Sequence, residues 1–109
     1  MKTAELTGAA LNNAVHKLAY PDEPIKEGCT APPYSTDWAF CGPIIEREHI
    51  EWQWLPSSSK DHQYGARKPS FGGTKRTFCM DGPTVLIAAM RCYVASKLGD
   101  EVEIPEELT

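Results

Sequence analysis

The chain has 109 residues, of which 41% are hydrophobic and 24% are charged, and its net charge at neutral pH is −4. A chain of this length can bury one modest core, so we expect a single domain over residues 1–109. No apolar run is long enough to cross a bilayer, and the first residues, MKTAELTGAALNN, lack the apolar stretch of a secretory signal. We therefore expect no membrane association, and a mature chain that starts here and stays cytoplasmic.

The negative charge is concentrated at the carboxyl end of the chain. Residues 100–109 hold five of the fifteen acidic residues and no base, so the rest of the chain carries ten acids against eleven bases. This balance does not indicate a general nucleic-acid-binding surface. A local excess of bases could hold an anion, although a solvated loop of mixed charge is the commoner outcome. These bases are Lys60, Arg67, Lys68, Lys75 and Arg76, with only Asp61 opposing them.

The four cysteines, at positions 29, 41, 79 and 92, form no C-x-x-C pair, and the three histidines form no H-x-x-x-H pair. This spacing predicts no metal site, and no cofactor is expected. Because no signal peptide indicates an oxidising compartment, we expect reduced thiols, with Cys92 packed as a small hydrophobe.

The first predicted element is a helix of about three turns that starts after Thr7 as N-cap and ends at Pro21. Leu6 is placed to contact Leu11 across the start of the helix. His16 lies beside the apolar stripe, so we expect it to be solvated. The stripe has helical spacing and consists of Leu11, Ala14, Val15 and Leu18.

Residues 20–33 contain four prolines and predict an extended linker. Beyond it, residues 43–49 fit one or two helical turns with Pro43 in the first position, or a strand beginning at Ile44. Alternation of apolar and polar residues over 50–54 predicts a half-buried strand whose aromatic side chains, Trp52 and Trp54, face inward.

Residues 55–73 are rich in Ser, Gly, Pro and Lys without a sustained period, so they predict a long loop. Residues 74–80 predict a second strand that pairs with 50–54, and Asp81-Gly82 then predicts a turn. The last helix is predicted from Thr84 as cap to Gly99, with a stripe of Leu86, Ile87, Met90, Tyr93, Val94 and Leu98. Arg91 is expected at the edge of the core, either facing a ligand or with a solvated head.

These elements predict an α+β fold. An N-terminal helix and a long C-terminal helix would pack on a small antiparallel sheet built from residues 44–54 and 74–80. Residues 55–73 would form a long loop and residues 100–109 an acidic tail.

Two runs of sequence carry a family resemblance. YSTDWAFCGPIIERE at 34–48 and GPTVLIAAMRCYVASKLGDEVEIPEEL at 82–108, together with the amino-terminal LTGAAL, resemble the NinX-like proteins of lambdoid phages and their prophages. The chain departs from their pattern at Phe40-Cys41, which could narrow a site there, and at Val85. The resemblance implies a phage accessory protein in the host bacterial cytoplasm, from a family whose domain has no assigned function.

The pattern of residues does not favour an enzyme. Asp37, Glu46, Glu48 and His49 could act as acids or bases, but no spacing identifies a nucleophile with its base, and G-x-S-x-G, P-loop and H-E-x-x-H motifs are missing from the sequence. A small hydrolase remains an alternative.

A binding module fits the residues better, because aromatic faces and short polar groups around a Gly-Pro bend can hold a flat polar ligand. The leading hypothesis is a non-catalytic homo-oligomer that sequesters a nucleotide-like small molecule such as a host immune signal, with arginines for its phosphates. Alternatively, these side chains cap turns and fill the core, or the protein inhibits a host protein as an adaptor. The candidate ligand-binding residues are Tyr34, Ser35, Thr36, Asp37, Trp38, Gly42, Pro43, Arg47 and Arg91.

Overall fold

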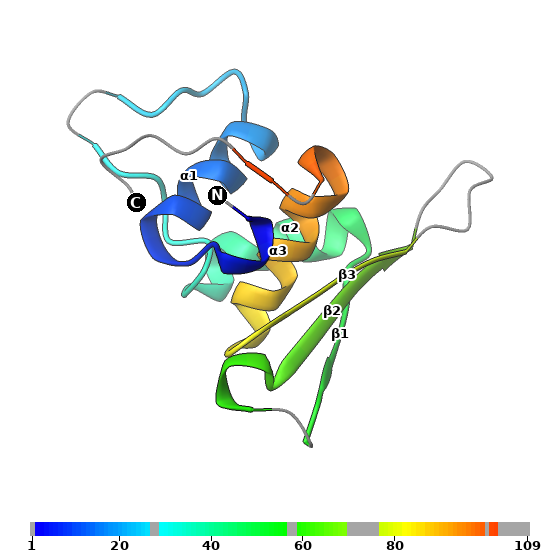
Figure 1. Cartoon of the computed structure of the whole chain (residues 1–109). Helices are drawn as coiled ribbons and strands as arrows, with labels where there is room; N and C mark the ends of the chain where they lie inside the picture. Colours follow the sequence, from blue (N-terminus) through cyan, green and yellow to red (C-terminus); the bar gives the residue numbers. More distant parts are fainter. Residues whose placement is uncertain (1, 27–28, 57–58, 70–76, 100, 103–109) are drawn as a thin grey trace.

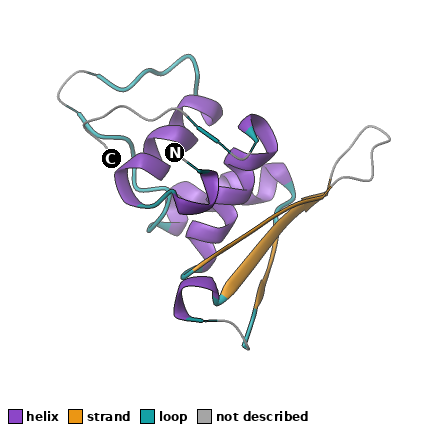
Figure 2. Ribbon diagram, in the orientation of Figure 1, coloured by secondary structure: helices purple, strands orange, loops and turns teal. Residues whose placement is uncertain are grey.

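The computed structural model describes residues 2–26, 29–56, 59–69, 77–99 and 101–102. Within them the chain has the predicted α+β fold, with the helices gathered on one side of a three-stranded antiparallel sheet (Figures 1 and 2). The sheet order is β1-β2-β3. In chain order the elements are the 3-10 turn η1 (Thr3–Glu5), α1 (Gly8–Ala19), α2 (Trp38–Glu48), β1 (Glu51–Trp54), the 3-10 turn η2 (Lys60–His62), β2 (Tyr64–Pro69), β3 (Thr77–Gly82) and α3 (Val85–Leu98).

Helix α3 is the centre of the core, as the sequence predicts. The hydroxyl of Thr84 caps it by accepting a hydrogen bond from the Ile87 amide at 3.2 Å. Leu86 and all residues from 88 to 95 are buried, because α3 lies between the sheet and α1. Gly82 permits this close packing, since a Cβ atom there would lie 3.0 Å from the Ala88 amide nitrogen. The core thus depends on a glycine in the strand beneath the helix.

Helix α1 buries the predicted stripe, with Leu18 only partly covered. Thr7 occupies the N-cap position, and Leu6 and Leu11 are both fully buried in the core. The prediction for His16 is wrong. The residue is 9% exposed, and its ring lies between the Tyr34 hydroxyl and the Glu23 carbonyl oxygen, which supply the polar partners that water would otherwise provide.

The segment before β1 is helical rather than extended, so the strand predicted over residues 44–48 is wrong. Helix α2 begins earlier than expected, because Asp37 acts as N-cap and accepts a hydrogen bond from the Ala39 amide at 2.9 Å. Pro43 consequently lies inside the helix instead of in its first position. The helix ends at Glu48, and the C-cap residue His49 adopts a left-handed conformation with φ of 55° and turns the chain into β1.

The central strand of the sheet lies where a loop was predicted. β2 occupies residues 64–69 and pairs with β1 on one side and β3 on the other, so the predicted direct pairing of 74–80 with 50–54 is also wrong. Asp81 and Gly82 continue β3 and do not form a turn. Pairing on both sides stabilises β2 despite a sequence, YGARKP, of low strand propensity. Residues 70–76 of the predicted loop and strand lie outside the described residues.

The predicted aromatic face of β1 points toward the helices but is not buried. Trp52 is opposite Ala66, which is 3% exposed, yet Trp52 and Trp54 are 49% and 63% exposed. The reason is that α3 lies mainly over β2 and β3, while β1 is an edge strand.

Among the helices that the structure describes, none is long and apolar enough to cross a membrane. The predicted acidic tail lies outside the described residues except for residues 101 and 102, where Glu101 forms an isolated bridge with Lys2.

Candidate functional site

Two tryptophans from different elements form an open aromatic corner beside the edge strand. Trp38 is the first residue of α2 and Trp52 lies in β1; their ring centroids are 6.5 Å apart and their planes are tilted by 63°. Trp38 is 52% exposed. Trp54 lies two residues after Trp52 and therefore on the same side of β1. We call Trp38, Trp52 and Trp54 the tryptophan corner.

The position of Trp38 follows from the local sequence. Asp37 fixes the start of α2 through its hydrogen bond to the Ala39 amide, so the next side chain leaves the first turn of the helix toward β1. Thr36 precedes the cap and is exposed. With 52% of its surface exposed, Trp38 is not sealed in the core. Asp37 uses one carboxylate oxygen to cap the helix.

Tyr34 and Ser35 are buried at 2% exposure and belong to the interior. The Tyr34 ring stacks with Tyr20 and meets Phe40 in a T-shaped arrangement, and burial raises the pKa of its hydroxyl to about 12. Ser35 donates its amide hydrogen to the Asn12 side chain at 2.9 Å. These two predicted ligand contacts hold the segment before α2 against α1, so a ligand at the corner would not meet them.

Cys41, in the same helix, is fully buried, and burial raises the pKa of its thiol to about 12. It does not narrow the surface site. Its neighbour Phe40 is 42% exposed and contacts Tyr34. Gly42 and Pro43 lie in the middle of α2 and form no bend between two segments.

Arg91 lies inside the protein, contrary to the expectation of an edge position. It is 5% exposed; its Nε donates to the Leu6 carbonyl and one terminal nitrogen donates to the Asp81 carbonyl, each at 2.8 Å. Burial lowers its pKa, and the charges of Asp81 and Asp61 partly counter this effect. Arg91 thus ties the amino-terminal segment and β3 to α3.

The last predicted residue, Arg47, belongs to a cluster of cations around Glu48. The Glu48 carboxylate lies 2.7 Å from Lys68, 3.1 Å from Arg47 and 3.7 Å from Lys97, which come from three different elements. Burial alone would raise the pKa of Glu48, but the hydrogen bonds from Lys68 and Arg47 and the charge of Lys97 leave it below its ordinary value. The sequence gives no local signal for this cluster.

The corner and this cluster are separate. Trp38 and Arg47 are nine residues apart in one helix, which corresponds to about 14 Å along its axis. Nine residues are also two and a half turns, so the two side chains leave opposite faces of the helix, and a ring stacked at the corner would not carry its nearest phosphate to Arg47. Of the predicted site residues, Thr36, Asp37 and Trp38 are consecutive and none of them is buried, and the fold adds Trp52 to them.

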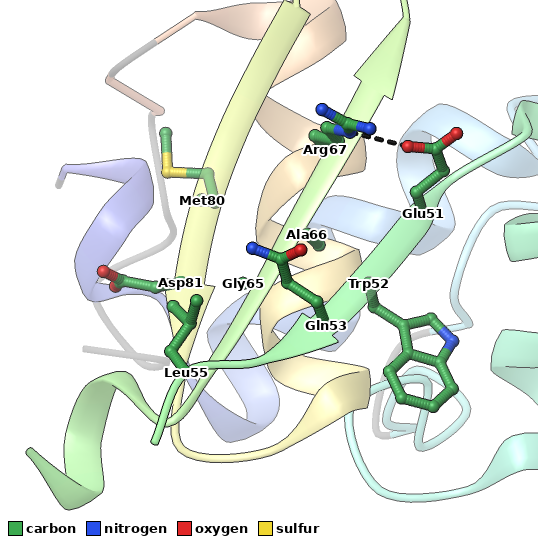
Figure 3. Close-up of a pocket in the computed structure, with 9 residues that line it drawn as sticks. All are labelled: Glu51, Trp52, Gln53, Leu55, Gly65, Ala66, Arg67, Met80 and Asp81. Carbon is green, nitrogen blue, oxygen red and sulfur yellow. Dashed lines mark hydrogen bonds and ion pairs between the residues drawn. The ribbon is translucent and has the colours of Figure 1, made fainter. Parts of the chain in front are cut away.

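The outer face of the sheet carries a shallow hollow of about 390 Å³ (Figure 3). Its floor is Gly65, flanked across the strands by Gln53 and Asp81. Ion pairs already occupy its charged groups, Arg67 with Glu51 at 2.6 Å and Asp81 with His62 at 2.7 Å. No group of three metal-ligating side chains occurs within the described part of the chain.

Comparison with known proteins agrees with the resemblance seen in the sequence. The family model described as "Bacteriophage P22, NinX" matches residues 2–97, which include the whole corner, all of α1 and α2, and α3 except its last residue. None of the curated proteins matches the chain.

Proposed function

From the premise that this chain belongs to the bacteriophage P22 NinX family, we propose that it is a phage accessory protein that captures a flat, nucleotide-like small molecule at the tryptophan corner. Such capture would sequester a signal of the host's immune response in the bacterial cytoplasm. The proposal contains no chemical step.

One observation carries this proposal, namely that Trp38 and Trp52 are about half exposed and meet edge to face. This arrangement leaves ring surface open to a planar ligand. Stacking of a nucleobase on an aromatic side chain contributes about 1–3 kcal/mol. Thr36 and the second carboxylate oxygen of Asp37 are short polar groups beside the start of α2 and can bind ring amines or hydroxyls.

The proposal rests on stacking of the ligand's ring and not on binding of its phosphates. Arg91 is buried and donates to two backbone carbonyls, and Arg47 lies about 14 Å along α2 from Trp38. The ligand's ring is therefore the part that this surface is suited to recognise. The two carboxylates next to the corner in sequence are both engaged, Asp37 as a helix cap and Glu51 in an ion pair with Arg67, which favours capture over turnover.

A second candidate is an adaptor or inhibitor that binds a host protein through the same surface. Trp54 favours it, because this side chain is 63% exposed and extends the apolar surface beyond what one ring would cover. Tryptophan is enriched among the residues that dominate binding energy at protein interfaces.

The test is mass spectrometry of small molecules that co-purify with the protein, followed by thermal shift with a nucleotide panel. A captured ligand should raise the melting temperature, and Trp38→Ala should abolish that shift in a folded protein. Leu98→Ala, which alters another half-exposed apolar side chain at the end of α3, should leave it unchanged. Capture is rejected if no ligand co-purifies and no nucleotide shifts the transition, whereas turnover of a panel member would instead indicate an enzyme.

A further inference from the structure

The edge strand β1 presents hydrogen-bonding groups to solvent. The Leu55 amide donates to the Gln63 carbonyl at 2.6 Å, and the register places Gln53 opposite Gly65 and Glu51 opposite Arg67. Opposed residues in an antiparallel ladder alternate between hydrogen-bonded and non-hydrogen-bonded pairs. Gln53 and Glu51 therefore direct their backbone groups toward β2, while those of Trp52 and Trp54 point to the open edge. β1 forms the outer margin of the sheet (Figure 1).

We propose that β1 pairs antiparallel with β1 of a second copy of this chain, around a twofold axis at Gln53, to form a six-stranded sheet. In this register Trp52 of each copy is opposite Trp54 of the other. The outward backbone amides and carbonyls of these residues then form hydrogen bonds between the two copies. Because of the twofold axis, each of these hydrogen bonds occurs twice. The pairing is thus self-complementary along the edge.

Neighbouring registers would form fewer backbone hydrogen bonds between the two edge strands. An axis at Trp52 would place Ile50 opposite Trp54, but the Ile50 amide already donates to the Ile45 carbonyl at 3.1 Å. An axis at Trp54 would place Pro56, which has no amide hydrogen, opposite Trp52. These losses favour the axis at Gln53.

Charge also favours the register at Gln53. An axis at Glu51 would set two carboxylates opposite each other, which destabilises a strand pair. With the axis at Gln53, Glu51 is instead opposite Leu55, and two neutral amides meet on the outer face. Figure 3 shows Gln53 on that outer face and the Trp52 ring leaving the strand on the other side.

The aromatic side chains of β1 favour a second copy of this chain as the partner of the edge strand. Edge strands of monomeric proteins are commonly protected by lysine, proline or a bulge, whereas β1 reads EWQW and forms a regular ladder with β2. In the proposed pair, Trp52 and Trp54 of one copy lie beside Trp54 and Trp52 of the other on the same face of the sheet. Two tryptophans that the monomer leaves 49% and 63% exposed would become cross-strand pairs.

A charge-reversal experiment tests the pairing and its register. Gln53→Glu and Gln53→Lys each place like charges at the axis, and both keep the fold because Gln53 is an exposed side chain. Sedimentation equilibrium of the wild-type chain should show a dimer, and each variant should raise its dissociation constant about fivefold or more. An equal mixture of the two variants should recover the dimer, because opposite charges then meet. Ala9→Glu and Ala9→Lys, at an exposed position of α1, should leave dimerisation unchanged.

A wild-type chain that stays monomeric at all accessible concentrations would overturn the inference. So would a dimer insensitive to either charge at Gln53, which would place the interface elsewhere, or a mixture that fails to associate. Ligand capture is judged separately by Trp38→Ala, so the two proposals can fail independently.

Discussion

Nδ1 of His16 lies 2.8 Å from the hydroxyl of Tyr34, and this contact joins α1 to the segment that leads into α2. The other ring nitrogen faces the Glu23 carbonyl oxygen, which can only accept a hydrogen bond. Nε2 must therefore carry a proton, and in the neutral ring Nδ1 accepts the Tyr34 hydroxyl hydrogen. The pair fixes the loop from which Asp37 and Trp38 emerge.

Tyr34→Phe should lower the free energy of unfolding by about 1–2 kcal/mol, because it leaves a buried ring nitrogen of His16 without its partner. Urea denaturation measures this change. Tyr20→Phe is the matched control, since Tyr20 stacks beside Tyr34 but is only partly buried, and it should cost less than about 0.5 kcal/mol. Equal effects of the two variants would contradict the role assigned to the buried hydroxyl.

Arg91→Ala should destabilise the protein by about 3 kcal/mol, because the carbonyl groups of Leu6 and Asp81 lose charged donors in the interior. Arg91→Lys should recover only part of this loss, since one ammonium group does not reproduce the geometry of two guanidinium nitrogens. Thermal and urea unfolding at neutral pH provide the measurement. A cost below about 1 kcal/mol would fit the edge position predicted from sequence instead.

The contrast between α3 and β2 shows what the sequence could predict of the fold. Helix α3 carries its own signals, a threonine cap, an apolar stripe and a terminal glycine, all within residues 84–99. β2 carries few, because Gly65, Ala66 and Arg67 have no preference for a strand, and the segment becomes one through pairing on both sides. The strands that pair with β2 lie outside residues 64–69, so the sequence of this segment does not show the pairing.

The candidate site likewise combines residues with local sequence signals and residues whose partners lie elsewhere in the chain. Trp38 could be selected from composition and its neighbouring cap residue, but its partner Trp52 is contributed by a strand that was expected to face the core. Arg91 and His16 are polar residues whose buried partners lie 85 and 18 residues away along the chain. Helical spacing showed where these residues lie on their helices and gave no sign of what covers them.

The Glu48 cluster predicts a defined pH dependence. Because the folded protein holds the pKa of Glu48 below its ordinary value, the ionised carboxylate stabilises the fold above the pKa of the unfolded chain, and this contribution is lost as pH falls through the lower folded value. Glu48→Gln should therefore reduce the melting temperature at neutral pH, and the difference from wild type should shrink in acid. A difference that is constant from neutral pH down to strongly acidic pH would contradict this assignment.

Trp54→Ala distinguishes an open edge strand from the inward aromatic face predicted by alternation. A tryptophan packed in a core would cost about 3–5 kcal/mol on truncation. With 63% of its surface exposed, Trp54 should cost less than about 1 kcal/mol when unfolding is measured on dilute monomer. Ile44→Ala serves as the comparison, because Ile44 is fully buried in α2 and its truncation should cost about 2–5 kcal/mol. Similar losses for the two variants would mean that β1 is covered within a single chain, and the surface on which both capture and strand pairing depend would not exist.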